Sequence, residues 1–175
     1  MKYQRVHILG GAGSGKTTLA RAYASKHGLC HYELDDFYYS HAANRTRRSE
    51  QERSELMVAA ASNHSWVIDG IFWQSWVLPA AQRADKIIVL AVPEMTRHRR
   101  VISRHISLLK QAPLSEYPRF FPTLFELLIH NRSYNKGPLQ ETLQLLQDFE
   151  EKVVLCSTNH AAAIALGLNP AEIST

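Results

Sequence analysis

Nine residues near the start of the chain, Gly10 to Thr18, read GGAGSGKTT and follow a short apolar run. Their spacing matches the pattern Gly-x-x-x-x-Gly-Lys-Thr, in which Gly10, Gly15, Lys16 and Thr17 hold the fixed positions. Glycine lets the backbone turn its N–H groups inward as a nest for anions, and a helix beginning near Gly15 adds its positive N-terminal end. The pattern therefore predicts a phosphate-binding loop between a strand and a helix.

The residue types in this loop also predict its ligands. In loops of this pattern the lysine, here Lys16, reaches the β- and γ-phosphates of a nucleotide, and the hydroxyl group of Thr17 ligates Mg²⁺. We therefore expect ATP and Mg²⁺ as cofactors, although no residue distinguishes ATP from GTP. The residues expected to hold the triphosphate are Gly10, Gly11, Ala12, Gly13, Ser14, Gly15, Lys16, Thr17 and Thr18.

Apolar, β-branched runs alternate with helical patterns along the rest of the chain. The helix after the loop is expected to end at Gly28, and Ser49 with Glu52 forms a capping box that predicts a helix over 49–62. Another helix is expected over 93–111. The predicted strands are 3–9, 30–34, 65–69, 86–92 and 152–157. Strands that alternate with helices predict an α/β fold with a parallel sheet, and the length of 175 residues suits a single domain.

The segment 111–137 interrupts this alternation between the fourth and fifth strands. Pro113, Pro118 and Pro122 make it irregular, although a helix is expected around 123–134. An insertion at this place could act as a mobile lid.

The composition excludes several classes of protein. With 45% hydrophobic and 21% charged residues the chain is an ordinary globular mixture, and no apolar run is long enough to span a membrane. The two cysteines lie far apart and the nine histidines show no zinc spacing, so neither a disulfide scaffold nor a zinc site is indicated. We expect a cytoplasmic protein. Its net charge of +4 permits nucleic acid as a partner, but no nucleic-acid-binding module is recognisable.

Carboxylates follow two of the predicted strands, at the sheet edge where α/β proteins bind ligands. Asp35 and Asp36 come directly after the second strand, and either could accept a proton from a substrate hydroxyl while the other holds Mg²⁺ or orients the substrate. The alternative is that one of them only caps the helical turn that follows. Asp69 closes the third strand, before Gly70, and is placed to hold Mg²⁺ directly or through water. The alternative for Asp69 is an N-cap or turn aspartate.

Three arginines lie on one face of the helix predicted over 93–111. Arg97, Arg100 and Arg104 are spaced i, i+3 and i+7, and near the loop they would clamp phosphates and neutralise charge during transfer. A solvated basic face is the alternative. Arg132, late in the irregular segment, is a weaker candidate of the same kind.

Aromatic residues gather behind two strand ends. They could stack a base or wall an acceptor pocket, and packing in the core is equally compatible with their positions. They are Phe37, Tyr38, Tyr39, Phe72, Trp73 and Trp76.

The order of these motifs resembles the adenylate-kinase-like P-loop kinases, and most closely the small bacterial DNA topology modulation proteins. The resemblance rests on the loop and on ELDDFYY, WVIDGIFWQSW, ADKIIVLAVP and TRHRRVISRHI, and it covers 3–108 and the last strand. It implies a P-loop NTPase three-layer sandwich, with helices on both faces of a five-stranded parallel sheet in the order 2-3-1-4-5. It also implies Mg-dependent phosphoryl transfer from ATP to a small acceptor.

Carried over residue by residue, the resemblance puts Asp35 and Asp36 in the acceptor site and makes Asp69 the Mg-associated carboxylate. Adenylate kinases continue after the equivalent aspartate–glycine pair with a Phe-Pro-Arg turn. This chain lacks that turn, which argues against AMP as the acceptor. The arginines that would approach the donor or the lid are Arg97, Arg100 and Arg104.

Two classes of function agree with these residues. The first is a kinase that phosphorylates a nucleotide, a nucleoside or another small metabolite, with Lys16, the paired aspartates and the arginines as its catalytic groups. The second is a nucleotide-dependent regulator or nucleic-acid-associated ATPase without a small-molecule acceptor. The small size and the paired carboxylates favour the kinase.

Overall fold

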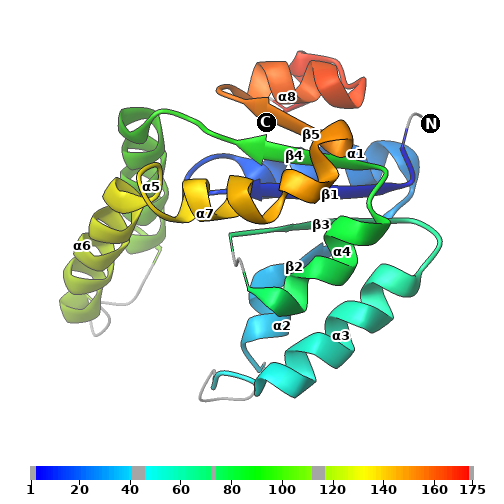
Figure 1. The fold of residues 1–175 in the computed structure, drawn as a ribbon. Helices are drawn as coiled ribbons and strands as arrows, with labels where there is room; N and C mark the ends of the chain where they lie inside the picture. The colour runs from blue at the N-terminus through cyan, green and yellow to red at the C-terminus, as the bar shows by residue number, and fades with distance from the viewer. Residues whose placement is uncertain (1–2, 41–45, 72–73, 112–116, 174–175) are drawn as a thin grey trace.

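A computed structural model describes residues 3–40, 46–71, 74–111 and 117–173, with the backbone alone for 117–122. Its centre is a five-stranded sheet in which the strand pairings are parallel (Figure 1). The order β2-β3-β1-β4-β5 confirms the expected topology. The strands are β1 (Arg5–Gly10), β2 (Cys30–Glu33), β3 (Trp66–Gly70), β4 (Lys86–Leu90) and β5 (Val153–Cys156).

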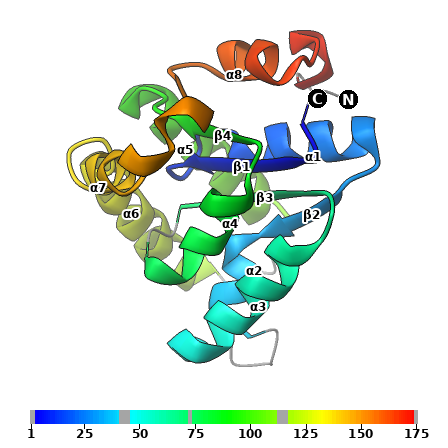
Figure 2. The same cartoon turned by 45° about the vertical axis from the view of Figure 1, so that its right-hand side comes forward.

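Helices cover both faces of the sheet, which gives the three layers expected of a P-loop NTPase (Figures 1 and 2). One face carries α1 (Lys16–His27) and α8 (Asn159–Leu166). The other carries α2 (Leu34–Tyr38), α3 (Glu50–Ser62), α4 (Leu78–Arg83) and α7 (Pro138–Leu145). Within the described ranges, no helix has the length and apolar character needed to cross a membrane.

Alternation along the strands divides the core in two. In β1, Val6 and Ile8 pack with α1 and α8, whereas Leu9 packs with the helices of the opposite face. In β4, Ile88 and Leu90 face α1 and α8, whereas Ile87 and Val89 pack with the helices of the opposite face. Because both faces of the sheet are covered, β4 is almost continuously apolar after Lys86.

Helices α5 (Glu94–Leu109) and α6 (Tyr117–Ser133) pack against each other beyond the edge at which the strands end (Figure 1). The helix expected around 123–134 therefore begins earlier than predicted. Pro118 falls in its first turn, where N–H groups have no intrahelical partner, so this proline does not prevent the helix. Pro113, also named in the predicted lid, lies outside the described residues.

Two local predictions had opposite outcomes. The capping box is confirmed, because Ser49 Oγ accepts from the Glu52 N–H at 3.2 Å and Glu52 Oε2 accepts from the Ser49 N–H at 2.7 Å. The predicted end of the second strand was wrong, because β2 stops at Glu33. Asp35 and Asp36 lie instead in the first turn of α2, where free N–H groups favour negative charge.

Candidate active site

The glycine-rich loop joins the end of β1 to the start of α1, at the edge where the strands end. Gly13 and Gly15 have φ angles of 74° and 86°, which side-chain-bearing residues rarely adopt. A Cβ on Gly13 would lie 2.5 Å from the carbonyl oxygen of Arg97, and one on Gly15 would lie 2.5 Å from Asn159 Nδ2. Both positions therefore need glycine for conformation and for space. The loop therefore packs between α5, which carries Arg97, and α8, which carries Asn159.

Lys16 begins α1 and lies among charged groups. Burial lowers the pKa of Lys16, while the negative charges of Asp69 and Asp35 act in the opposite direction. The guanidinium of Arg104 lowers the pKa again, and Glu33 raises it. An ammonium group that is poorly solvated and close to both cations and carboxylates is suited to binding a multiply charged anion.

Thr17 and Asp69 meet beside this lysine. The Thr17 hydroxyl donates to Asp69 Oδ2 at 2.7 Å, although the two residues are 52 positions apart. The parallel pairing of β1 with β3 sets Leu9 opposite Gly70, so Asp69 lies near the end of β1. The loop that follows β1 leads to Thr17 at the start of α1, which brings the two residues together. Hydroxyl and carboxylate oxygens are hard ligands that Mg²⁺ prefers, so this pair fits a magnesium ion at the end of the loop.

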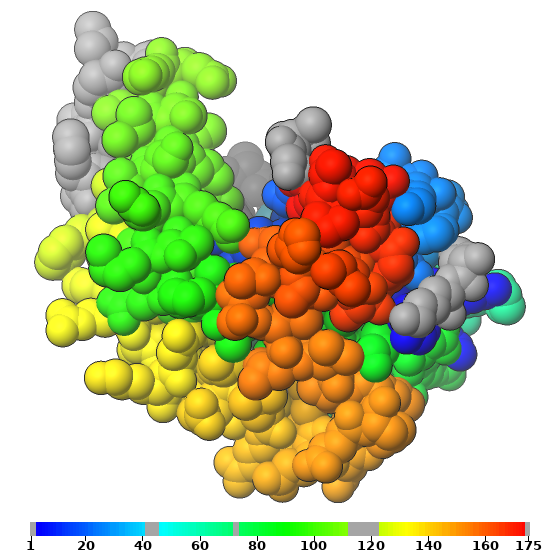
Figure 3. Space-filling view, turned by 90° about the horizontal axis from the view of Figure 1, so that it is seen from above, coloured from blue at the N-terminus to red at the C-terminus, as the bar shows by residue number. Residues whose placement is uncertain are grey.

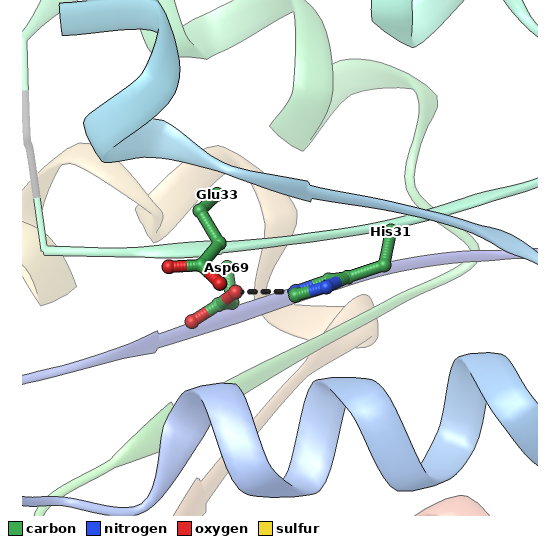
Figure 4. A group of neighbouring side chains, drawn as sticks. All are labelled: His31, Glu33 and Asp69. Carbon is green, nitrogen blue, oxygen red and sulfur yellow. Dashed lines mark hydrogen bonds and ion pairs between the residues drawn. The ribbon is translucent and has the colours of Figure 1, made fainter. Parts of the chain in front are cut away.

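The carboxylate of Asp69 has a second partner. His31 Nε2 lies 2.7 Å from Asp69 Oδ1, and the Asp69 side chain is only 1% exposed (Figure 4). His7 on β1 is also close to this charge, but burial lowers the pKa of His7 to about 4, which keeps the imidazole neutral at neutral pH. Asp69 is thus a buried anion with hydrogen-bond partners for both oxygens.

The two adjacent aspartates are exposed on α2. The negative charge of Asp35 is one of the causes that raise the pKa of Lys16, so Asp35 lies within electrostatic reach of the loop lysine. A Cβ on Gly70 would lie 2.5 Å from Leu34 Cβ, which means that α2 packs directly on the end of β3. This contact positions the start of α2 beside the loop.

Two of the three predicted arginines have side chains that line the cleft over the loop. Arg100 Nη1 donates to the Ser14 carbonyl at 3.0 Å and to Asn159 Oδ1 at 2.7 Å, so it braces the loop from outside. Arg104 lies one turn further along α5 and lines the same cleft as Lys16. Arg100 lines this cleft too, but its guanidinium already donates to Ser14 and Asn159, so Arg104 is the better placed of the two to meet a phosphate.

The structure corrects the expectation for Arg97. This residue is fully buried, and its guanidinium donates hydrogen bonds to other groups of the protein. Nε donates to Asn131 Oδ1 at 2.7 Å, Nη2 donates to the Asn131 carbonyl, and Nη1 donates to the Val92 carbonyl and to Asn135 Oδ1, each at 2.6 Å. Arg97 ties α6 to α5 beneath the loop. The helical spacing places the three arginines on one face of α5, but it does not show which of their side chains is buried in the protein.

A cleft of about 630 Å³ opens over the loop, between α5 and the C-terminal segment (Figure 3). Its walls include residues that the sequence analysis missed. They follow β5, whose end lies at the same edge of the sheet, so the topology alone could have suggested them. The missed residues are Asn159, His160, Pro170, Ala171 and Ile173.

The predicted aromatic group packs mainly in the core. Phe37, Tyr38 and Trp76 are buried in the cluster beneath α2 to α4. The guanidinium carbon of Arg53 lies 4.7 Å from the ring centre of Tyr38 and 5.6 Å from that of Trp76, so one cation contacts both rings. Two further members of the predicted group, Phe72 and Trp73, lie outside the described residues.

Comparison with known sequences identifies one distant relative. No protein-family model matches the chain. The uncharacterized protein YqaC of Bacillus subtilis (strain 168) is 25% identical over 101 residues, which cover 58% of this chain and 56% of that protein. The chain thus matches only about half the length of this curated relative. The resemblance to the DNA topology modulation proteins stays a prediction.

Comparison with solved structures supports the fold. A sugar kinase from Janibacter sp. HTCC2649 has a TM-score of 0.50 and 18% identity, covering 98% of each chain. Shikimate kinase from Acinetobacter baumannii in complex with shikimate has a TM-score of 0.44 and 16% identity, covering 83% of this chain and 93% of that one. A gluconokinase from Sinorhizobium meliloti 1021 has a TM-score of 0.47 and 16% identity, covering 98% and 91%. The parallel sheet in the order 2-3-1-4-5, shared with P-loop kinases, is therefore the fold of this chain.

Proposed function

We propose that this chain is a small-molecule kinase that transfers the γ-phosphoryl group of ATP, with Mg²⁺, to a small acceptor. The observation that carries the proposal is the hydrogen bond of 2.7 Å between Thr17 and Asp69, beside Lys16. This hydrogen bond brings a hydroxyl and a carboxylate that could hold the metal together at the end of the glycine-rich loop, next to the lysine that would bind the phosphates. A carboxylate, Asp35, is within electrostatic reach of the same lysine.

The loop residues would act by positioning and by charge. The backbone N–H groups from Gly10 to Thr18 would surround the phosphates, while Lys16 and Arg104 would stabilise negative charge on the transferring group. Thr17 and Asp69 would hold Mg²⁺, which supplies further charge neutralisation when bound. No covalent enzyme intermediate is required, because the acceptor attacks the phosphorus directly.

Asp35 is the residue that we assign to the acceptor. Its carboxylate would accept the proton of the acceptor hydroxyl or orient that hydroxyl toward the γ-phosphate. Asp36, the neighbour of Asp35 in the first turn of α2, would serve a secondary role. The acceptor would then enter on the side of α2, opposite the cleft between α5 and the C-terminal segment, which would take the nucleoside.

The pair formed by α5 and α6 could contribute a lid. Both helices extend past the sheet edge that carries the loop (Figure 1). Arg104 on α5 lines the cleft. Closure over the bound nucleotide would exclude water and so limit hydrolysis of ATP without transfer. The fold shared with a sugar kinase agrees with a small acceptor of this kind.

The test is phosphoryl transfer from ATP with Mg²⁺ to a panel of nucleosides, nucleoside monophosphates and small hydroxy compounds. ADP is measured with and without each acceptor, and the phosphorylated product is identified by mass spectrometry. Transfer to one acceptor that is lost in Lys16→Ala would support the proposal. ADP release that ignores every small acceptor but rises with DNA or RNA would contradict it, in favour of a nucleic-acid-associated ATPase.

A further inference from the structure

Three metal-ligand side chains converge next to the Thr17–Asp69 pair. His31 and Glu33 alternate along β2, so they point to the same face of the sheet, and Glu33 lies directly opposite Asp69 in the pairing of β2 with β3. One ligand atom from each of the three residues lies within 4.8 Å of the others (Figure 4). The imidazole and the two carboxylates are therefore close enough to bind one ion together.

The charges at this place favour a cation. Like charges directly opposite each other on neighbouring strands are destabilising, and Glu33 and Asp69 form such a pair. The Arg21 guanidinium contacts Glu33 at 2.7 Å, but the Arg21 side chain is 68% exposed, so this ion pair compensates weakly. Lys16 is also close to both carboxylates, but it is needed for the phosphates of the proposed function. A divalent cation would neutralise both carboxylates.

We propose that His31, Glu33 and Asp69 form a binding site for a divalent transition-metal ion. Imidazole nitrogen together with carboxylate oxygen is a donor set suited to Zn²⁺, Co²⁺ or Mn²⁺, whereas Mg²⁺ prefers oxygen alone. Asp69 would serve two neighbouring ions, because Oδ1 faces His31 and Oδ2 faces Thr17. The site shares Asp69 with the proposed kinase but does not depend on phosphoryl transfer.

The competing explanation is that His31 only orients Asp69 through its hydrogen bond. Glutamine separates the two explanations, since its side-chain amide can donate to Asp69 but is a poor metal ligand. Cys30 begins β2 and is exposed, so its thiol could bind the metal separately. All measurements are therefore made in a Cys30→Ser background. His64, an exposed histidine just before β3, gives the matched control His64→Gln.

The experiment titrates Co²⁺ alone into the nucleotide-free protein and follows the visible d–d absorption, whose intensity and position change when Co²⁺ moves from water into a protein site. We expect saturable binding that His31→Gln weakens at least about tenfold, with a similar loss in Glu33→Gln and none in His64→Gln. Equal Co²⁺ affinity in His31→Gln and in the parent would overturn the proposal and leave His31 as a positioning residue. Circular dichroism and thermal unfolding confirm that each variant is folded.

A second variant keeps this test separate from the proposed function. Lys16→Ala should lose phosphoryl transfer yet bind Co²⁺ at least as tightly as the parent, because it removes a positive charge near both carboxylates. Co²⁺ binding that requires His31 in a protein without kinase activity would support the metal site and contradict the kinase. Phosphoryl transfer that requires Lys16, in a protein whose Co²⁺ binding does not depend on His31, would support the kinase and contradict the metal site.

Discussion

Arg100 on α5 and Asn159 on α8 are joined by a hydrogen bond of 2.7 Å across the outside of the glycine-rich loop. The same Arg100 nitrogen donates to the Ser14 carbonyl, and the Asn159 amide contacts Gly15 so closely that a Cβ there would lie 2.5 Å from Nδ2. These contacts link two helices, far apart in sequence, through the loop. The conformation of the loop therefore depends on both helices.

This link predicts a coupled effect on nucleotide binding. Arg100→Ala and Asn159→Ala should each weaken ATP binding, and the double variant should weaken it by less than the sum, with a coupling of about 1 kcal/mol. Isothermal titration calorimetry of the four proteins measures the cycle. Arg99→Ala, an exposed arginine on the same helix, is the control and should change nothing. Strictly additive effects would show that the bridge does not support the loop.

Substitution of the loop lysine tests the core of the proposed mechanism. Lys16→Ala should lower the rate of transfer by about two to three orders of magnitude, because a preorganised cation at the developing charge is lost. Its thermal unfolding should stay close to that of the parent. Lys110→Ala, at an exposed position after α5, controls for the loss of one positive charge. Retained transfer in Lys16→Ala would remove the loop from the mechanism.

Much of this site could be predicted from sequence, because its residues sit in local patterns. The loop motif fixed the strand, the turn and the helix around Lys16, and the acidic residue after an apolar strand led to Asp69. The partner His31 was missed. It carries no motif and reaches Asp69 only because β2 and β3 are neighbours, which is a property of the sheet and not of the local sequence.

The two aspartates of α2 give a test in which each is the control for the other. Asp35→Asn should lower transfer by about two orders of magnitude or more, as expected for the loss of a general base, with ATP binding still measurable. Asp36→Asn should have a much smaller effect, because the proposed mechanism gives the acceptor proton to Asp35, whose charge acts on Lys16. Acceptor-dependent initial rates measure both. A larger loss in Asp36→Asn would exchange the two assignments.

The arginines show where sequence periodicity stops being informative. The spacing i, i+3 and i+7 correctly put Arg100 and Arg104 on the side of α5 that meets the loop. It could not show that Arg97, on the same stripe, is covered by α6, because that packing depends on a helix far along the chain. The same limit applies to Asn131, the buried partner of Arg97, which belongs to α6.

The corrected role of Arg97 predicts a loss of stability. Arg97→Met should lower the free energy of unfolding by about 3 kcal/mol or more, because it leaves several buried acceptors unpaired at roughly 1–3 kcal/mol each. Urea unfolding followed by circular dichroism measures the change. Arg99→Met, which is exposed, should alter stability by less than about 0.5 kcal/mol. A stable Arg97→Met protein that loses only transfer would restore the catalytic interpretation.

Buried His7 predicts how stability depends on pH. Burial lowers the pKa of His7 from 6.5 to about 4 in the folded protein, so between these values the unfolded chain binds the proton more readily. The contribution of His7 is therefore complete above pH 6.5 and is lost as the pH falls toward 4. The loss should reach about 2 kcal/mol at pH 5, from 1.36 kcal/mol per pKa unit.

The measurement compares urea unfolding at pH 7 and pH 5 for the parent and for His7→Leu. The leucine variant cannot bind this proton, so its stability should fall less between the two pH values than that of the parent, by the same amount of about 2 kcal/mol. His64→Leu, at an exposed position, should keep the pH dependence of the parent. Equal losses of stability in His7→Leu and in the parent on acidification would show that folding does not lower the pKa of His7, which would contradict this prediction.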